Sequence, residues 1–388
     1  MFTYLSERTA RPATGINTSY WGNSVWPIKY DNLEEDLSVD IVVIGGGIAG
    51  STIAYCLAQE GKKVALVDSG YIGNGETGRS MAHLIVTPDD SYSRLERTYG
   101  KGYARLTADS HMAAIDFIER VTRKETIECD FERLNGYLFL QADHQPAILK
   151  RELYAALNAG LEVKEMNTMP GIKQSEEYCL MFANQAQMHP LKYLKGLCEA
   201  IQSNGGRIFT ETPVDEIVPG GLVTNFGLRI HAERIVIATN SPANNKYMRH
   251  LKQLSYRTYI IGAKVKKDSL PRALWWDTGN HHVRLLKYDR EFDLLLCGGE
   301  DYSGRINENI SISEEQRYQS LENWMRERFN AEDVIYKWRR CLSKPLDRFA
   351  YIHNNAEVDD HVYIVPGDPG NGLTHSTIAG IIVADLLS

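Results

Sequence analysis

The chain contains 388 residues with a formal net charge of −7, and 43% of its residues are hydrophobic and 24% charged. A chain of this length usually forms two or more domains, and this composition is that of a globular protein with a large core. The basic residues form no cluster, so we expect no nucleic-acid partner. No window approaches the roughly 18 consecutive apolar residues of a membrane-spanning helix, and the N-terminus lacks the apolar core of a secretion signal. We therefore expect no membrane span and a cytoplasmic location.

Six cysteines are scattered along the chain without a Cys-x-x-Cys pair or a cluster of cysteine and histidine. This pattern is typical of reduced thiols rather than of a disulfide framework or a metal site. We expect no bound metal ion.

The first 37 residues are mostly polar, with scattered aromatic side chains that include Tyr20, Trp21, Trp26 and Tyr30. No apolar periodicity marks a helix or a strand in this segment. We expect it to lie over the surface of the domain that follows.

A strand, a glycine-rich turn and a helix are predicted next. Residues Ile41 to Ile44 form an apolar run suited to a strand buried on both faces, and Gly45, Gly47 and Gly50 follow in a Gly-x-Gly-x-x-Gly pattern. The first glycine permits a tight turn, the second lets the backbone approach a pyrophosphate, and the third lets the helix pack closely on the strand. The N-terminus of the helix then directs unpaired N–H groups at the phosphates.

A second strand, Val64 to Val67, leads to Asp68. A carboxylate at this position accepts hydrogen bonds from a ribose hydroxyl and disfavours the extra phosphate of NADP. Strand, turn, helix, second strand and acid together predict a dinucleotide-binding unit, which by itself would serve NAD or FAD equally.

The rest of the chain is predicted to alternate helices and strands, and the C-terminus again shows a strand, a glycine turn and a helix. Gly160 is suited to the C-terminal end of a helix and Gly227 to a hairpin turn. Helices are expected at about 91–123, 146–159, 189–204, 314–328 and 374–387, and strands at about 137–140, 207–210, 214–218, 234–240, 259–264, 283–287, 294–297 and 362–365.

Four segments together resemble the FAD-dependent oxidoreductases of the D-amino acid oxidase, glycine oxidase and sarcosine oxidase superfamily. They are Asp40 to Gly50, Gly75 to Ser80, Ile235 to Asn240 and Gly367 to Gly372. A plain NAD-dependent dehydrogenase would not explain the glycine turn near the C-terminus. The resemblance covers nearly the whole chain and implies FAD as the cofactor.

Two further segments, Gln185 to Leu194 and Gly298 to Asp301, are most similar to a bacterial branch of this superfamily. In that branch a C-terminal Rieske iron–sulfur domain often follows the flavoprotein part. The present sequence shows no Cys and His spacing of the Rieske type, so we expect no iron–sulfur cluster.

The fold implied by the resemblance is of the α/β class. A discontinuous, Rossmann-like FAD-binding domain is expected at residues 1–90, 186–249 and 331–388. A second, α+β substrate domain built on a mostly antiparallel sheet is expected at 91–185 and 250–330.

The resemblance also implies which residues hold FAD. The first glycine turn would bind the pyrophosphate, and distant segments would bind the adenine and isoalloxazine ends. The helix N-terminus near residue 372 would stabilise the negative charge that develops near N1 and O2 of the flavin. Taken singly, each residue is equally compatible with an ordinary turn or strand end. The expected cofactor residues are Gly45, Gly47, Ile48, Ala49, Gly50, Asp68, Ser69, Gly78, Arg79, Ser80, Ala82, His83, Val214, Thr239, Asn240, Gly370, Asn371, Gly372, Leu373 and Thr374.

Two departures from the family pattern bear on the reaction. Asp368 and Pro369 stand where relatives often carry small or aromatic residues, and an acid turned toward the flavin O2 would oppose an anionic flavin. Sarcosine oxidases carry a lysine that assists the reaction with oxygen, whereas this chain has Leu294 to Cys297 in that strand. Fast reduction of oxygen is therefore not implied.

The catalytic residues predicted from the resemblance are His83, Arg340 and Tyr259. His83 would orient the substrate or tune the flavin, and the alternative is a hydrogen-bonded structural histidine. An amino-acid carboxylate needs a cation, best an arginine fork, for which Arg340, Arg257 and Arg284 are the candidates; surface ion pairs are the alternative. Tyr259 would line the substrate pocket, as would His281 and His282, and the alternative is that all three are residues of the sheet surface.

Cys341 lies within one residue of the place where sarcosine oxidases attach the flavin covalently. An offset of one residue on a strand turns a side chain to the opposite face, so non-covalent FAD remains the alternative.

The predicted reaction is oxidation of the C–N bond of a small amine or amino acid by hydride transfer to flavin N5. Either oxygen or a separate electron carrier would then accept the electrons. A dehydrogenase with a protein or quinone acceptor is one alternative, and a catalytically weak electron-transfer flavoprotein is another.

Overall fold

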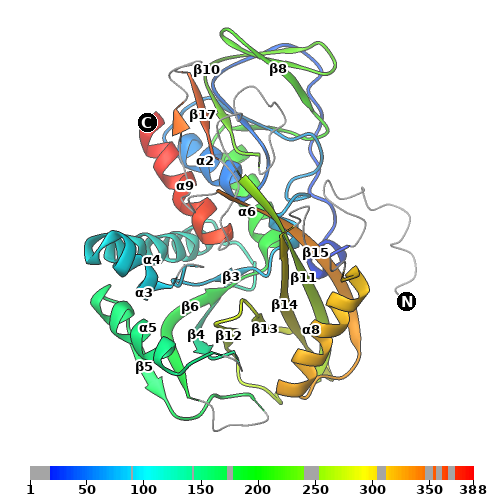
Figure 1. The fold of residues 1–388 in the computed structure, drawn as a ribbon. Coiled ribbons are helices and arrows are strands. Elements are labelled where there is room, and N and C mark those ends of the chain that lie inside the picture. The colour runs from blue at the N-terminus through cyan, green and yellow to red at the C-terminus, as the bar shows by residue number, and fades with distance from the viewer. Residues whose placement is uncertain are drawn as a thin grey trace.

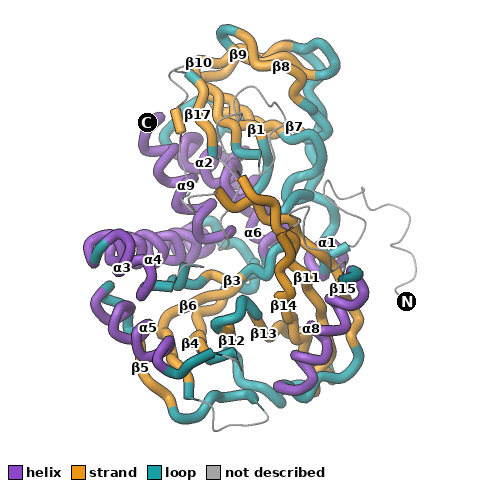
Figure 2. Tube along the Cα trace, in the orientation of Figure 1, coloured by secondary structure: helices purple, strands orange, loops and turns teal. Residues whose placement is uncertain are grey.

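The computed structural model describes residues 18–88, 91–141, 144–172, 178–239, 253–303, 312–345, 353–354, 361–365 and 372–388. They form two β-sheets with helices packed between and around them (Figure 1). In that view the first sheet lies toward the top and the second toward the bottom. Figure 2 shows the strands of both sheets separated by helical segments. The predicted α/β class is confirmed.

The first sheet is mostly parallel, with β1 (Leu37–Ile44) at its centre. Strands β2 (Val64–Val67) and β10 (Arg229–Ile237) flank β1 in parallel. The sheet extends through β7 (Arg207–Phe209) on one side and β17 (Val362–Ile364) on the other, both parallel to their neighbours. Short antiparallel strands complete it: β16 (His353–Asn354), β8 (Val214–Val218) and β9 (Gly221–Thr224).

Both faces of the first sheet are covered, which explains the unbroken apolar run in β1. Val43 on one face packs in a core with α2 (Ile48–Gln59), α6 (Pro190–Ser203) and α9 (Gly372–Leu387). Val42 on the other face packs with Leu33 and the β8–β9 hairpin. The carboxyl end of β1 therefore points its glycine turn at the N-terminus of α2.

The second sheet is mostly antiparallel, as predicted, and among its described strands only the pair β12–β4 is parallel. Helix α8 (Glu314–Arg328) covers one face, and we call this the α8 face. The opposite, inner face adjoins the helices of the first sheet. In spatial order its strands are β15 (Val334–Pro345), β11 (Gln253–Lys266), β14 (Phe292–Ser303), β13 (His282–Lys287), β12 (Leu274–Asp277), β4 (Glu132–Phe139), β6 (Cys179–Gln187) and β3 (His83–Leu84), and β5 (Val163–Met166) pairs with β6.

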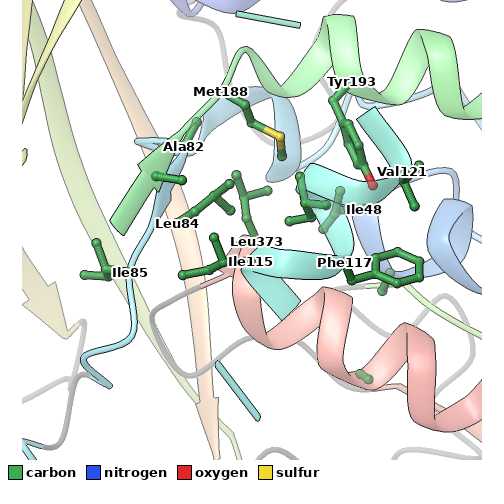
Figure 3. Close-up of a cluster of buried hydrophobic side chains, with 14 of the residues drawn as sticks. Ile48, Ala82, Leu84, Ile85, Ile115, Phe117, Val121, Met188, Tyr193 and Leu373 are labelled. Carbon is green, nitrogen blue, oxygen red and sulfur yellow. The ribbon is translucent and has the colours of Figure 1, made fainter. Parts of the chain in front are cut away.

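A continuous apolar core joins the two halves of the molecule. Figure 3 shows Ile48 of α2 and Leu373 of α9 beside Ile115 of α4 (Lys101–Lys124), together with Leu84 of β3 and Met188. Helix α4 contacts α9 directly. The first sheet, the helices and the second sheet therefore share one central core, and each sheet has a further apolar cluster on its outer face.

The helix expected at 91–123 is two helices, α3 (Tyr92–Tyr99) and α4. Gly100 between them adopts a φ of +87°, which an α-helix does not accommodate. Helix α5 (Ala147–Asn158) ends close to Gly160, whose φ is +89°. Helix α8 begins after Ser313, which forms a capping box with Gln316.

The segment before β1 departs from the expectation that it covers the surface. It contains a short helix, α1 (Tyr20–Ser24), and the Trp21 side chain is fully buried. Among the large apolar side chains of residues 18–30, only that of Trp26 is strongly exposed, at 75%. The expectation was wrong for Trp21 because the indole N–H finds a buried partner elsewhere in the chain.

The domain boundaries expected from the sequence differ from the sheet topology at two places. Strand β15 lies after residue 331 but forms the edge of the second sheet, and β3 pairs with β6 in that sheet although it precedes residue 90. The chain therefore crosses between the two sheets within the ranges expected for the FAD domain.

Candidate functional site

The turn after β1 has a shape that only glycines fit. Gly45 adopts a φ of +110°, and a Cβ atom on it would lie 2.7 Å from the Ala238 carbonyl oxygen. A Cβ atom on Gly50 would lie 2.0 Å from the Gly45 carbonyl oxygen, so α2 approaches the turn as closely as a backbone permits. A Cβ atom on Gly47, the N-cap of α2, would meet only Thr77 Oγ1, at 3.3 Å.

The Asp68 carboxylate is held against this turn. Its Oδ2 accepts a hydrogen bond from the Gly46 N–H at 2.6 Å, and its Oδ1 accepts one from the Gly70 N–H at 2.8 Å. Burial raises the pKa of the Asp68 carboxyl, while the two N–H groups act in the opposite direction. Each carboxylate oxygen retains a lone pair that a ribose hydroxyl can use. The following residue, Ser69, is exposed, and Val214 begins β8 half-buried.

A short 3-10 helix, η1 (Thr77–Arg79), lies beside the N-terminus of α2. The Ile48 N–H donates to Thr77 Oγ1 at 3.1 Å, which links the two segments. A Cβ atom on Gly78 would lie 2.3 Å from the Gly73 carbonyl oxygen, so this position also requires glycine. The two glycine segments expected to hold FAD are therefore adjacent in space.

Side chains from distant segments bind the carbonyl groups of this loop. Ser19 Oγ donates to the Gly78 carbonyl at 2.5 Å, and Trp21 Nε1 donates to the Ser80 carbonyl at 2.8 Å. Trp338 Nε1, from β15, donates to the Arg79 carbonyl at 2.9 Å. Sequence reasoning missed Ser19, Trp21 and Trp338, and the only available signal was a tryptophan in an otherwise polar leading segment.

The exposed edge of β15 also binds this loop. The Arg79 guanidinium donates to the Arg339 carbonyl at 2.9 Å, and Glu76 accepts a hydrogen bond from the Cys341 N–H at 2.9 Å. Cys341 pairs with Arg257 of β11, so the alternation along the strand directs its thiol to the α8 face. Burial raises the pKa of the Cys341 thiol, and Glu76 raises it further.

Arg284 is fully buried and does not form the surface ion pair considered as its alternative role. Its Nη1 donates to the carbonyls of Met81 and Ala82 at 2.8 and 2.6 Å, and its Nη2 donates to the Met188 carbonyl at 3.2 Å. Its Nε donates to Gln187 at 3.1 Å. Burial lowers the pKa of the guanidinium to about 9. The N–H groups of Arg284 therefore donate mainly to backbone carbonyls rather than to a substrate carboxylate.

His83 begins β3 opposite Gln187 and lies on the inner face of the second sheet. Its ring centroid lies 5.7 Å from that of His282. Burial holds the pKa of His83 well below its usual value, and the nearby His282 and Arg284 lower it further. His83 is therefore neutral at pH 7.

Tyr259 and His281 are not brought together with His83. Tyr259 lies on the α8 face, with its ring centroid 5.1 Å from that of Tyr318 in α8. His281 lies on the same face, stacked on Trp324 at 4.2 Å. The pocket role expected for these two residues has no support in their position.

Arg340 lies on the inner face of the second sheet, opposite Thr258 of β11. It is two residues from Trp338, which contacts the loop from Gly78 to Ala82 that is expected to hold the flavin, here called the flavin loop. Arg340 therefore faces the same space. Thr258 Oγ1 donates to Asp301 at 2.7 Å in the same part of the sheet. His83, His282, Arg284 and Arg340 are thus the predicted polar residues that share this face.

Two buried hydroxyl groups lie where polar ligands gather in α/β sheets, at strand ends and helix starts. Thr239 follows β10 and Thr374 lies in the first turn of α9, and within the described residues neither Oγ1 has a hydrogen-bond partner. Gly372 and Leu373 start the same helix. Asn240, Gly370 and Asn371 lie outside the described residues, as do Asp368 and Pro369.

The described ranges contain no group of three or more His, Cys, Asp or Glu side chains that could hold a metal ion. Across the same ranges, every helix is too short or too polar to cross a membrane.

The chain matches the family model described as DAO, FAD dependent oxidoreductase, over residues 40–386. The Bacillus subtilis protein YhfW, named as a Rieske 2Fe-2S iron–sulfur protein, is 27% identical over 375 residues, covering 95% of this chain and 72% of YhfW. Glycine oxidase of Bacillus licheniformis is 40% identical over 371 residues, covering 90% of this chain and 92% of that enzyme. The crystal structure of glycine oxidase from Geobacillus kaustophilus shares the fold with a TM-score of 0.74 at 18% identity, covering 90% of this chain and 95% of that one.

The geometry fits the cofactor that this family carries. The glycine turn leads into the N-terminus of α2, a position that suits a pyrophosphate, and within the described residues the buried hydroxyls of Thr239 and Thr374 lack partners that a bound ligand would supply. The chain belongs to the DAO family of FAD-dependent oxidoreductases, which act on amines and amino acids.

Proposed function

We propose that this protein oxidises the C–N bond of a small amine or amino acid by transfer of a hydride to FAD. The observation that carries the proposal is the environment of His83. The burial and positive charge that lower its pKa also act on an amine bound beside it. Such an amine is held in its neutral form, which keeps the nitrogen lone pair that assists loss of a hydride from the adjacent carbon.

The residues assigned to FAD divide by segment. Gly45, Gly47 and Gly50 would contact the pyrophosphate, and Asp68 would accept from the adenosine ribose. Thr239 and Thr374 would donate their unpartnered hydroxyls. Bound FAD supplies the hydride acceptor.

The residues on the inner face of the second sheet divide the substrate tasks. Arg340 would bind the carboxylate of an amino acid, because it is buried beside Thr258 and faces the same space as the flavin loop. His83, as a neutral imidazole, would orient the amine through one hydrogen bond. A neutral amine needs no strong general base, so this reaction does not require a paired acid and base beside His83.

The proposal is tested by mixing the FAD-loaded protein with candidate substrates under anaerobic conditions and following the flavin absorbance. The panel contains glycine, D-alanine, N-methylglycine, L-proline, putrescine and spermidine. We expect at least one compound to bleach the flavin at a rate that Arg340→Met changes for carboxylate-bearing substrates but not for the polyamines. A panel without any bleaching contradicts the proposal and favours an electron-transfer flavoprotein.

A dehydrogenase is the second candidate, on one specific observation. Leu294, Leu295, Leu296 and Cys297 are fully buried apolar side chains, and none offers the cation that assists oxygen reduction in sarcosine oxidases. Hydrogen peroxide formed in air at the rate of substrate oxidation identifies an oxidase. Anaerobic bleaching followed by slow reoxidation in air, with a quinone restoring turnover, identifies a dehydrogenase.

A further inference from the structure

Five consecutive carbonyl groups, from Gly78 to Ala82, are each bound by a side chain from elsewhere in the chain. The donors to the first three are Ser19, Trp338 and Trp21, and Arg284 binds the last two. All of the distances are between 2.5 and 2.9 Å.

The orientation of these carbonyls fixes the orientation of the N–H groups. A trans peptide group is planar, and its C=O and N–H point in opposite directions. Trp21 therefore directs the N–H of Met81 away from itself, and Arg284 does the same to the N–H of Ala82. The Arg284 guanidinium lies 5.1 Å from the Trp21 ring centroid, so both carbonyls point to one side and both N–H groups to the other.

Among the residues that the structure describes, these two N–H groups have no partner. Within the described ranges neither Met81 nor Ala82 donates a backbone hydrogen bond, although the residues are only 6% and 2% exposed. The N–H groups of Arg79 and Ser80, by contrast, donate to Glu76 and Thr77 within the turn. Leaving a buried N–H unpaired costs about 1–3 kcal/mol, so two adjacent ones indicate a ligand that accepts hydrogen bonds.

Ala82 also adopts a φ of +55°, which is uncommon for a residue other than glycine. A left-handed residue within a loop brings successive N–H groups to one side and creates a concavity suited to anions. The hydrogen bond from Arg284 to the Ala82 carbonyl holds this conformation.

We propose that Arg284 and Trp21 are positioning residues that present the N–H groups of Met81 and Ala82 to acceptor atoms of the FAD isoalloxazine ring. The loop lies on the inner face of the second sheet, since a Cβ atom on Gly298 would be 3.0 Å from Met81 Sδ. Two donors stabilise the negative charge of the reduced ring more than the neutral oxidised ring. The loop therefore raises the reduction potential of the flavin. This inference depends on FAD binding and not on the identity of the substrate.

The test measures the potential of the bound FAD by anaerobic equilibration with a reference dye, which requires no substrate. Trp21→Phe removes one N–H donor and keeps an aromatic ring. Arg284→Lys keeps the positive charge but removes the planar guanidinium that binds several acceptors at once. In both variants we expect the affinity for reduced FAD to fall about tenfold more than that for oxidised FAD, which lowers the potential by about 30 mV.

Two matched variants control for loss of the same side-chain types. Trp338→Phe also removes an indole donor to a loop carbonyl, but the N–H of that peptide group already binds Thr77. Arg317→Met removes a buried arginine from the α8 face, where it lies 4.4 Å from the Tyr302 ring centroid. We expect both to keep the potential of the unaltered protein.

Equal potentials in all five proteins, or an equal fall in Trp338→Phe, would overturn the proposal. If Trp21→Phe or Arg284→Lys does not fold, the unaltered protein still decides the question by hydrogen exchange. In that experiment a peptide spanning residues 79–84 is compared with and without bound FAD. We expect two of its amides to exchange at least about tenfold more slowly when FAD is bound, and unchanged exchange contradicts the proposal. A failed substrate panel would leave both readouts intact.

Discussion

Nε2 of His111 in α4 lies 3.3 Å from Nε2 of His375 in α9. Nδ1 of His111 lies 2.8 Å from the Val86 carbonyl oxygen, which only accepts hydrogen bonds, so this nitrogen carries a proton. With a neutral His111 ring, its Nε2 accepts from Nε2 of His375. The two histidines thereby join α4 to the first turns of α9, next to Thr374.

We expect His111→Phe to lower the free energy of unfolding by about 0.5–1.5 kcal/mol, because the buried Val86 carbonyl loses one of its two donors and keeps only the Tyr92 hydroxyl. Urea denaturation measures the change. His231→Phe, at an exposed position of β10, is the control and should alter stability by less than about 0.5 kcal/mol. Similar losses in the two variants would contradict the role assigned to the pair.

Gly50→Ala should disrupt the turn that faces the pyrophosphate. The added Cβ would lie 2.0 Å from the Gly45 carbonyl oxygen, so α2 or the turn must move. Overpacking of this kind costs about 1–3 kcal/mol, and we expect the dissociation constant for FAD to rise at least about tenfold. Gly102→Ala places a Cβ in open space within α4 and should leave FAD binding unchanged. Quenching of flavin fluorescence compares the two variants.

Asp68→Ala should weaken FAD binding because the Gly46 and Gly70 N–H groups lose their shared acceptor. We expect a rise of about tenfold or more in the dissociation constant. Asp40→Ala is the control, since Asp40 also accepts a backbone hydrogen bond, from Lys63, but is partly exposed to solvent along β1 and away from the glycine turn. FAD affinity that is equal in Asp68→Ala and the unaltered protein would exclude the role of Asp68.

The buried ion pair between His281 and Asp277 predicts a loss of stability at alkaline pH. Burial by itself lowers the pKa of His281, but the hydrogen bond to Asp277 and the ion pair with Glu300, whose carboxylate lies 3.7 Å from Nε2, outweigh it and raise the pKa to about 9. Because the pKa is raised above the unfolded value, the stabilisation is fully present below about pH 6.5 and is lost as the pH rises through about 9. Urea denaturation at pH 6, 8 and 10 should show this fall, and His281→Gln should remove that part of the pH dependence. A fall of the same size in the variant would assign it to other groups.

The position of Cys341 predicts non-covalent FAD. Its thiol belongs to the α8 face, opposite the face on which Trp338 reaches the flavin loop. After precipitation with acid, we expect the flavin fluorescence in the supernatant. Flavin retained in the pellet, and released by Cys341→Ser, would show a covalent bond.

The elements built from local patterns were the ones that the sequence could predict. The strand ending at Ile44, the turn at Gly45 and helix α8 each follow from neighbouring residues: an apolar run, a glycine at positive φ and a capping box. The family resemblance supplied the two-sheet fold and FAD, because its motifs are spread over nearly the whole chain.

The contacts that hold the loop from Gly78 to Ala82 could not be predicted in the same way. Trp21 lies 59 residues from this loop along the chain, and Arg284 lies about 200 residues from it. Nothing in the local sequence of either residue indicates that its side chain is buried against the loop rather than exposed. Tyr259 illustrates the same difficulty for strands. The alternation of side chains along a strand assigns them to two faces, but it does not indicate which face helix α8 covers.

The hydrogen bonds that hold the loop from Gly78 to Ala82 have a consequence for biosynthesis. Its donors come from the beginning of the chain at Ser19 and Trp21, from the middle at Arg284, and from near the end at Trp338. A ribosome releases these segments in order, so a nascent chain that already contains Gly45 to Gly50 still lacks half of the residues that shape the loop. We expect FAD to be captured only after β15 has left the exit tunnel, as a step that follows synthesis rather than accompanies it.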